Sequence, residues 1–216
     1  MITLATHIGP RDENADAIGA IALKGCTVTV VCDGVGFRGK PAAEAAVAAV
    51  LAETKRRARA LAGAKWSTVD GVLHGAIERA TVEVERLPGR SHTTMLVAVV
   101  WTGRLAVAHT GDSRVWMSSF GALRPLVQPH GLGRIVRSTV PSTRQIDICH
   151  VDIDPDLLGE GLLVLASDGL DEPRGETAAE MVAAQIKAGA KDNVTAAVIP
   201  FYERSLDREI GPLVTL

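Results

Sequence analysis

The chain has 216 residues, of which 47% are hydrophobic and 22% are charged, and its formal net charge is −2. This size suffices for one substantial core, so we expect a single domain over residues 1–216. The near-neutral charge gives no global attraction to nucleic acid or anionic lipid, and no run of 18 uncharged apolar residues favours a membrane span. We therefore expect neither nucleic acid nor a membrane as a partner.

The N-terminal segment and the cysteines favour a cytoplasmic protein. Residues 1–14, MITLATHIGPRDEN, lack the basic region and apolar run of a signal peptide. Cys26, Cys32 and Cys149 make an odd count without CxxC spacing. Because Cys26 and Cys32 share the parity of Val28 and Val30, we expect them to pack on the buried face of a strand rather than bind metal.

Apolar runs of β type recur along the chain. They predict strands at residues 16–23, 26–32, 92–101, 104–109, 146–153, 161–167 and 193–200. The sequence WTGRL at 101–105 predicts a hairpin turn between two of these strands.

Two long helical patterns lie between the second and third of these strands. The first begins at Pro41, which suits a first helical turn, and ends near Gly63. Basic residues gather towards its end, where they would complement the helix dipole or, alternatively, form an anion-docking patch: Lys55, Arg56, Arg57 and Arg59.

The second helical pattern begins at Ser67, which with Asp70 forms a predicted capping box, and Pro88-Gly89 ends it. A third, shorter helix is predicted over 176–188. Strands, two helices, many strands and one late helix make an α+β order rather than a repeated βαβ unit. Packed sheets with helices outside would bury these patterns.

Aspartates recur at the ends of the apolar runs. These positions are Asp16, Asp33 (followed by Gly34), Asp112, Asp168 (followed by Gly169) and Asp192. Taken singly, an Asp-Gly pair after a strand could simply form a turn, and the same alternative applies to any one of these aspartates. Strand ends at one sheet rim could instead aim all of these side chains into a shared cleft.

Converging carboxylates would need cations, because neighbouring carboxylates cannot all ionise unaided. Oxygen ligands select Mg²⁺, Mn²⁺ or Ca²⁺ over Zn²⁺. The six histidines show no HExxH or comparable spacing, so histidine-ligated zinc is not expected. Two metals about 3.5–4 Å apart are a known solution for phosphoryl hydrolysis. Arg11, five residues before Asp16, could grip a phosphate or could simply be solvated.

Five segments, in order, resemble the metal-dependent protein phosphatases of type 2C from about residue 9 to residue 200. They are GPRDENAD, VVCDGVGFRGKPAAEAA, SHTTMLVAVV with AHTGDSRVW, LLVLASDGL and KDNVTAAVI. The resemblance implies a four-layer α-β-β-α sandwich, in which helices flank two central, mostly antiparallel sheets. The site would lie at one edge of the sandwich.

The resemblance also implies roles for the aspartates. Asp33 would bridge two Mn²⁺ or Mg²⁺ ions, with the Gly34 carbonyl on one of them. Asp168 and Asp192 would complete the direct carboxylate ligands, and Asp16 would bind directly or through water. Further roles would fall to two residues: Arg11, which would hold the substrate phosphate, and Asp112, which would help hold a third, weaker metal.

Some positions depart from the family pattern. Ala15 stands where an acid or amide usually precedes the final aspartate of the opening motif. The run after Gly34 lacks the family's frequent histidine, and Arg38 there cannot donate a proton at neutral pH. The 56 positions from Asp112 to Asp168 (168 − 112) are few for the family, so we expect a reduced flap and an open, unselective cleft. The helix that follows Gly169 in other members also looks missing.

The resulting hypothesis is a protein-serine/threonine phosphatase with roles in signalling, acting on phosphoproteins through a hydroxide at a binuclear centre. Its partners would be phosphoprotein substrates, with a Ser/Thr kinase acting on the same targets, and we expect a monomer. The alternative is a catalytically weak, phosphatase-like module that binds metal and phosphoproteins. Hydrolysis of a small phosphoester also remains open.

Overall fold

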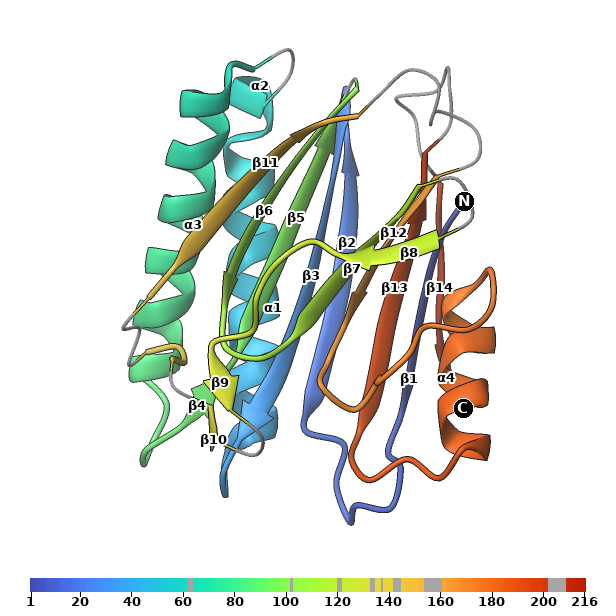
Figure 1. Ribbon diagram of the computed structural model, residues 1–216. Helices are drawn as coiled ribbons and strands as arrows, with labels where there is room; N and C mark the ends of the chain where they lie inside the picture. The colour runs from blue at the N-terminus through green and yellow to red at the C-terminus, as the bar shows by residue number, and fades with distance from the viewer. Residues whose placement is uncertain are drawn as a thin grey trace.

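The computed structural model describes residues 1–61, 64–101, 103–119, 122–132, 135–136, 138–141, 145–153, 161–201 and 209–216. Two central sheets face each other, with α1 and α3 outside one sheet and α4 outside the other (Figure 1). The expected four-layer α-β-β-α arrangement is therefore confirmed.

One sheet has six strands in the order β14-β1-β13-β12-β7-β8. Its strands are β1 (Ile2–His7), β7 (Arg114–Ser119), β8 (Ala122–Pro125), β12 (Leu162–Ala166), β13 (Val194–Pro200) and β14 (Ile210–Thr215). All neighbours are antiparallel except β1 and β14, which are parallel.

The other sheet has the order β11-β6-β5-β3-β2, with β4 paired to the end of β3. Its strands are β2 (Asp16–Leu23), β3 (Cys26–Val35), β4 (His92–Thr93), β5 (Met95–Trp101), β6 (Arg104–Thr110) and β11 (Asp147–Asp152). All of its pairings are antiparallel. A separate two-stranded ladder joins β9 (Gly131–Leu132) to β10 (Ile135–Val136).

The helices are α1 (Gly39–Arg56), α2 (Ala58–Leu61), α3 (Trp66–Glu85) and α4 (Ala178–Lys187). The predicted capping box at Ser67 is wrong: Lys65 is the N-cap of α3 and makes no side-chain cap bond. Asp70 instead contacts His150 of β11, with 2.6 Å between Oδ1 and Nε2. The predicted helix exit at Gly63 lies outside the described residues.

A capping box does form at α4, where the sequence reading placed none. The Thr177 hydroxyl accepts a hydrogen bond from the Glu180 backbone N–H, and the Glu180 carboxylate accepts one from the Thr177 N–H. Residues 167–177 before it hold no helix, as expected.

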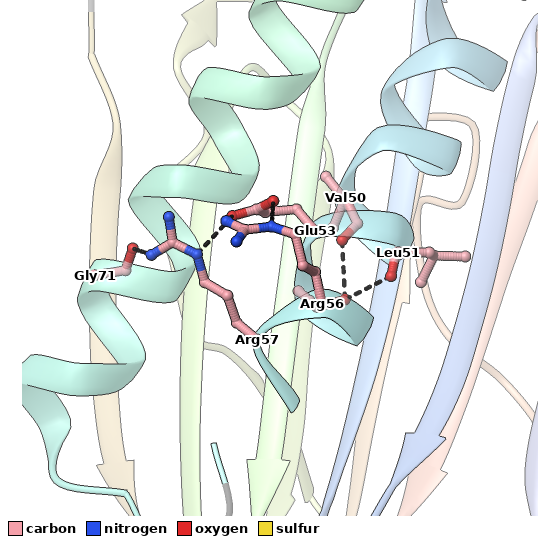
Figure 2. Close-up of polar contacts among 7 residues, drawn as sticks. Val50, Leu51, Glu53, Arg56, Arg57 and Gly71 are labelled. Carbon is pink, nitrogen blue, oxygen red and sulfur yellow. Dashed lines mark hydrogen bonds and ion pairs between the residues drawn. The ribbon is translucent and has the colours of Figure 1, made fainter. Parts of the chain in front are cut away.

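A buried glutamate explains the basic cluster at the end of α1 (Figure 2). Glu53 accepts hydrogen bonds from the guanidinium groups of Arg56 and Arg57. Arg57 also donates to the Gly71 carbonyl of α3, which ties the two helices together. Hydrogen bonds and charge from the two arginines hold the pKa of Glu53 down at about 2. For Arg56 and Arg57 these contacts favour a structural role over an anion-docking patch.

Three apolar clusters correspond to the three interfaces between the four layers. One packs α1 and α3 on the β2-containing sheet, one fills the space between the sheets, and one packs α4 on the β1-containing sheet. Cys26 and Cys32 belong to the first cluster and are buried, as predicted from strand parity. No helix among the described residues has the length and apolar character needed to cross a membrane.

Candidate metal centre

Strand direction brings the predicted aspartates to one edge of the sandwich. Because β2 and β3 are antiparallel, Asp16 at the start of β2 lies directly opposite Asp33 near the end of β3. β6, which runs parallel to β3, ends just before Asp112. In the facing sheet, antiparallel β12 and β13 place Asp168 and Asp192 at their adjacent ends.

Three of these carboxylates form a tight group. Ligand-capable oxygens of Asp33, Asp112 and Asp168 all lie within 4.8 Å of one another. The Asp112 Oδ1 atom is buried without a hydrogen-bond partner among the described residues. Three carboxylates with oxygens this close, one of which carries an unpartnered oxygen, are a donor set that fits a divalent cation of the Mg²⁺ or Mn²⁺ type.

Asp16 lies next to this group, opposite Asp33 in the β2–β3 ladder. Its Oδ2 accepts a 2.7 Å hydrogen bond from the Ser167 hydroxyl, which precedes Asp168 in the chain. Burial, reinforced by the charges of Asp168 and Asp192, raises the pKa of Asp16 to about 7.

The pKa values of Asp33, Asp112 and Asp168 are shifted in the same direction. Burial and the charges of Asp16 and Asp168 raise the pKa of Asp33 well above its usual range. Burial and the charge of Asp168 raise the pKa of Asp112 to about 6, and burial and Asp192 raise that of Asp168. Without cations the site resists full ionisation, and divalent metal would relieve this repulsion.

Arg11 reaches the same edge through an ion pair. Its Nη2 donates to Asp192 Oδ2 at 2.5 Å, and the arginine side chain is largely exposed. The guanidinium thus sits beside the acidic group, where a substrate phosphate could be gripped. The structure therefore brings all the predicted side chains to one edge.

Asn193 organises this edge, and the sequence reading gave it no role. Its side-chain amide donates to the carbonyls of Ile8 and Glu13, and its Oδ1 accepts from the Ala15 N–H at 2.9 Å. One side chain therefore shapes the loop that carries Arg11 and leads to Asp16. Its position directly after Asp192 was the only available signal, and spacing alone does not distinguish it from a strand residue.

Hydroxyl groups fix the backbone of Asp33 in a similar way. Thr94 Oγ1 accepts from the Asp33 N–H at 2.9 Å, and Thr93 Oγ1 donates to the Asp33 carbonyl. Ser113, next to Asp112, bonds Thr94 with 2.7 Å between the hydroxyl oxygens. These contacts interrupt the single strand predicted over 92–101, which divides into β4 and β5 at Thr94.

Two glycines allow close backbone contacts at the site. A Cβ on Gly34 would lie 2.2 Å from the Gly39 carbonyl carbon, and one on Gly169 would lie 1.9 Å from the Asn193 carbonyl oxygen. Asp33-Gly34 is not a turn, because β3 continues to Val35. The turn interpretation therefore fails for Asp33 and holds for Asp168-Gly169.

The residues that differ from the family pattern have structural positions next to the site. The Ala15 carbonyl accepts from the Gly34 N–H at 3.2 Å, so this segment is held by its backbone. Arg38 is the N-cap residue of α1, and Phe37 before it is 96% exposed. Two acids that follow Asp168 also form ion pairs and are highly exposed: Asp171 pairs with Arg114, and Glu172 pairs with Arg174.

A sequence profile of the protein phosphatase 2C family matches residues 5–201. The chain belongs to the protein phosphatase 2C family. As a member it is a hydrolase, a metal-dependent protein phosphatase acting on phosphoserine and phosphothreonine. A search of curated proteins found no match.

Solved structures of bacterial phosphatases share the fold of this type 2C phosphatase. The S. agalactiae serine/threonine phosphatase is 21% identical, with 93% of this chain and 98% of that chain covered and a TM-score of 0.75. PppA from Pseudomonas aeruginosa is 20% identical, with 94% and 97% covered and a TM-score of 0.76. The Mycobacterium tuberculosis phosphatase PstP/Ppp is 18% identical, with 94% and 98% covered and a TM-score of 0.72.

Proposed function

We propose that this phosphatase uses a binuclear Mn²⁺ or Mg²⁺ centre held by Asp33, Asp168 and Asp192. The Gly34 carbonyl and Asp16 would add oxygen ligands directly or through water. The grouping of Asp33, Asp112 and Asp168 within 4.8 Å, in a family of metal-dependent phosphatases, carries this proposal. When bound, such a metal pair supplies charge stabilisation and activates water for attack on phosphorus.

The chain's own residues bind and orient the substrate. Arg11 is the cation that would receive the phosphate oxygens, because its guanidinium already contacts a carboxylate at this edge. A covalent phosphoenzyme is not needed. Ser113 and Ser167 are engaged with Thr94 and Asp16, and burial raises the pKa of the Cys26 thiol to about 11. None of these side chains is a ready nucleophile.

Asp112 is proposed as a ligand for a third, weaker ion. Its Oδ1 atom has no hydrogen-bond partner among the described residues, and one of its carboxylate oxygens lies within 4.8 Å of oxygens of Asp33 and Asp168. We further propose that the whole chain, residues 1–216, acts as one monomeric cytoplasmic domain in signalling. It would reverse the action of a Ser/Thr kinase on shared phosphoprotein targets.

The metal requirement can be tested directly. Hydrolysis of p-nitrophenyl phosphate and of a phosphothreonine peptide is measured with Mn²⁺, with Mg²⁺ and with EDTA. We expect turnover with either ion and none with the chelator. Equal turnover in EDTA would eliminate the metal mechanism. Tight divalent binding by calorimetry without turnover on any phosphopeptide would instead support the phosphatase-like binding module.

Substitution of single ligands tests the residue assignment. We expect Asp33→Asn and Asp168→Asn each to reduce kcat by at least ~10²-fold, because an anionic ligand of the centre is lost. Asp152→Asn is the matched control, since Asp152 is an exposed carboxylate at the end of β11. An unchanged rate in Asp168→Asn would show that the centre is misplaced.

A further inference from the structure

A second group of metal-ligating side chains lies beside the aspartate centre. His109 of β6, His130 before β9 and Asp147 at the start of β11 have ligand-capable atoms within 4.8 Å of one another. The His130 Nε2 atom lies 2.9 Å from Asp147 Oδ2, and the His109 Nε2 atom lies 3.8 Å from the same oxygen. Two imidazoles thus converge on one carboxylate.

Both imidazoles are removed from water. His109 is 2% exposed and His130 is 9% exposed, and their ring centroids are 4.3 Å apart. A metal ion binds imidazole through a deprotonated ring nitrogen, so an ion here would replace the 2.9 Å contact between His130 and Asp147.

We propose that His109, His130 and Asp147 form a binding site for a borderline transition-metal cation, with Zn²⁺ as the expected occupant. Imidazole nitrogen with one carboxylate oxygen is a donor set that suits zinc better than Mg²⁺. Donor atoms on a zinc ion with bonds of about 2.0–2.1 Å are roughly 3.3 Å apart, and the observed 2.9 Å and 3.8 Å bracket that spacing. The Asp147 side chain is 48% exposed, which leaves room for a water molecule as a fourth ligand.

The surroundings of the rings set an expectation for affinity. In zinc sites the second imidazole nitrogen usually donates to a carboxylate or carbonyl, which fixes the ring. Here the Nδ1 atoms of His109 and His130 are buried without a partner in the described part of the chain. Gln145 does orient the carboxylate, because its amide donates to both oxygens of Asp147 at 3.0 Å. We therefore expect an affinity below that of structural zinc sites.

The position of this site gives it a structural consequence. The backbone N–H of His130 donates to the Gly111 carbonyl at 2.7 Å, directly before Asp112. Asp147 and His109 face each other across the β11–β6 ladder. A cation here would fasten the segment that follows β8 to the sheet edge, next to the proposed third-metal ligand.

The test is carried out on the full chain with the first centre disabled by Asp33→Asn and Asp168→Asn. Zn²⁺ and Mg²⁺ are titrated by calorimetry after metal removal, and Co²⁺ is added to report imidazole ligation through its visible absorption. We expect one Zn²⁺ per chain, with Mg²⁺ bound more weakly. The readout is independent of catalysis, so loss of this site and failure of the proposed phosphatase mechanism are distinguishable.

Added substitutions decide the assignment. Asp147→Asn and His130→Gln should each weaken Zn²⁺ binding by at least ~10-fold, a loss that even outer-shell partners can cause. Asp152→Asn, on the same strand, should leave it unchanged. Because the Asp147 side chain is half-exposed, the Asp147→Asn variant should fold normally, which circular dichroism can verify. Absence of Zn²⁺ binding, or equal affinity in Asp147→Asn, would overturn the proposal.

Discussion

The Nη2 atom of Arg11 donates a 2.5 Å hydrogen bond to Oδ2 of Asp192, 181 residues further along the chain. Arg11 therefore already occupies one oxygen of Asp192, a carboxylate that is also a proposed metal ligand. Cations at the site would compete with Arg11 for Asp192 and release the arginine towards phosphate.

Removal of the Arg11 side chain should weaken substrate binding more than metal binding. We expect Arg11→Ala to reduce kcat/KM for a phosphopeptide by about 10–100-fold, equivalent to about 1.4–2.7 kcal/mol, because charge-assisted hydrogen bonds to phosphate are lost. Mn²⁺ affinity, measured by calorimetry, should stay equal or rise. Arg174→Ala, at an exposed ion pair with Glu172, is the control. An unchanged kcat/KM in Arg11→Ala would contradict the phosphate role.

The buried Asp16 predicts how stability changes with pH in the metal-free protein. Its folded pKa of about 7 exceeds the ordinary value of 3.8, so the folded state holds the proton more tightly than the unfolded state. The protonated Asp16 therefore contributes on the order of a few kcal/mol to the free energy of unfolding. This contribution is fully present below about pH 4 and is lost as pH rises through about 7.

The measurement compares urea unfolding of wild type and Asp16→Asn in EDTA from pH 4 to pH 8. Because Asn mimics the protonated acid, wild type should lose free energy of unfolding relative to the variant across this window. Saturating Mn²⁺ should remove the loss. A difference between the two proteins that does not vary with pH would refute the assignment of this shift to Asp16.

Two glycines with different surroundings should respond oppositely to alanine. Gly34→Ala should destabilise the fold and reduce activity, because its Cβ would meet the backbone of Gly39 at 2.2 Å. Gly71→Ala in α3 has nothing within 4 Å and should stabilise by about 0.5–1 kcal/mol through helix propensity. Thermal unfolding measures both, and a neutral Gly34→Ala would show that β3 and α1 approach less closely.

Two glutamates, each flanked by a pair of arginines, allow a matched comparison of burial. The Glu53 side chain is 9% exposed, whereas Glu83, bridged by Arg79 and Arg86, is 28% exposed. Glu53→Gln should cost about 1–2 kcal/mol and lower Tm by about 2–6 °C, because charged hydrogen bonds at a buried position are lost. Glu83→Gln should cost less than about 1 kcal/mol. Equal Tm shifts for the two variants in scanning calorimetry would argue against a stabilising contact between α1 and α3 through Glu53 and Arg57.

Sequence periodicity predicted most of the strands that surround the site. The run at 16–23 matches β2, and the runs at 104–109 and 193–200 differ from β6 and β13 by one residue. β1, β7 and β14 had no prediction, although each has six residues, as many as the predicted β11. The α+β class therefore followed from local patterns, whereas the order of strands in each sheet did not.

The aspartates could be located from the sequence because each adjoins a recognisable strand. Their supporting residues could not: the role of Asn193 depends on contacts with Ile8 and Glu13, about 180 residues away. The histidine cluster was also undetectable by spacing, since His109 and His130 are brought together only by the packing of the segment after β8. The expectation of no histidine-ligated zinc rested on local motifs alone.

The acidic group draws its members from both layers of the sandwich: Asp16 and Asp33 from one sheet, Asp168 and Asp192 from the other. Cations shared by these residues would act as a clasp across the interface between the sheets. A small shift of one sheet over the other would then alter the coordination distances and weaken ion binding, even if every ligand were intact. Substitutions that create cavities in the apolar core between the two sheets should therefore lower the affinity for the metal ions before they unfold the protein.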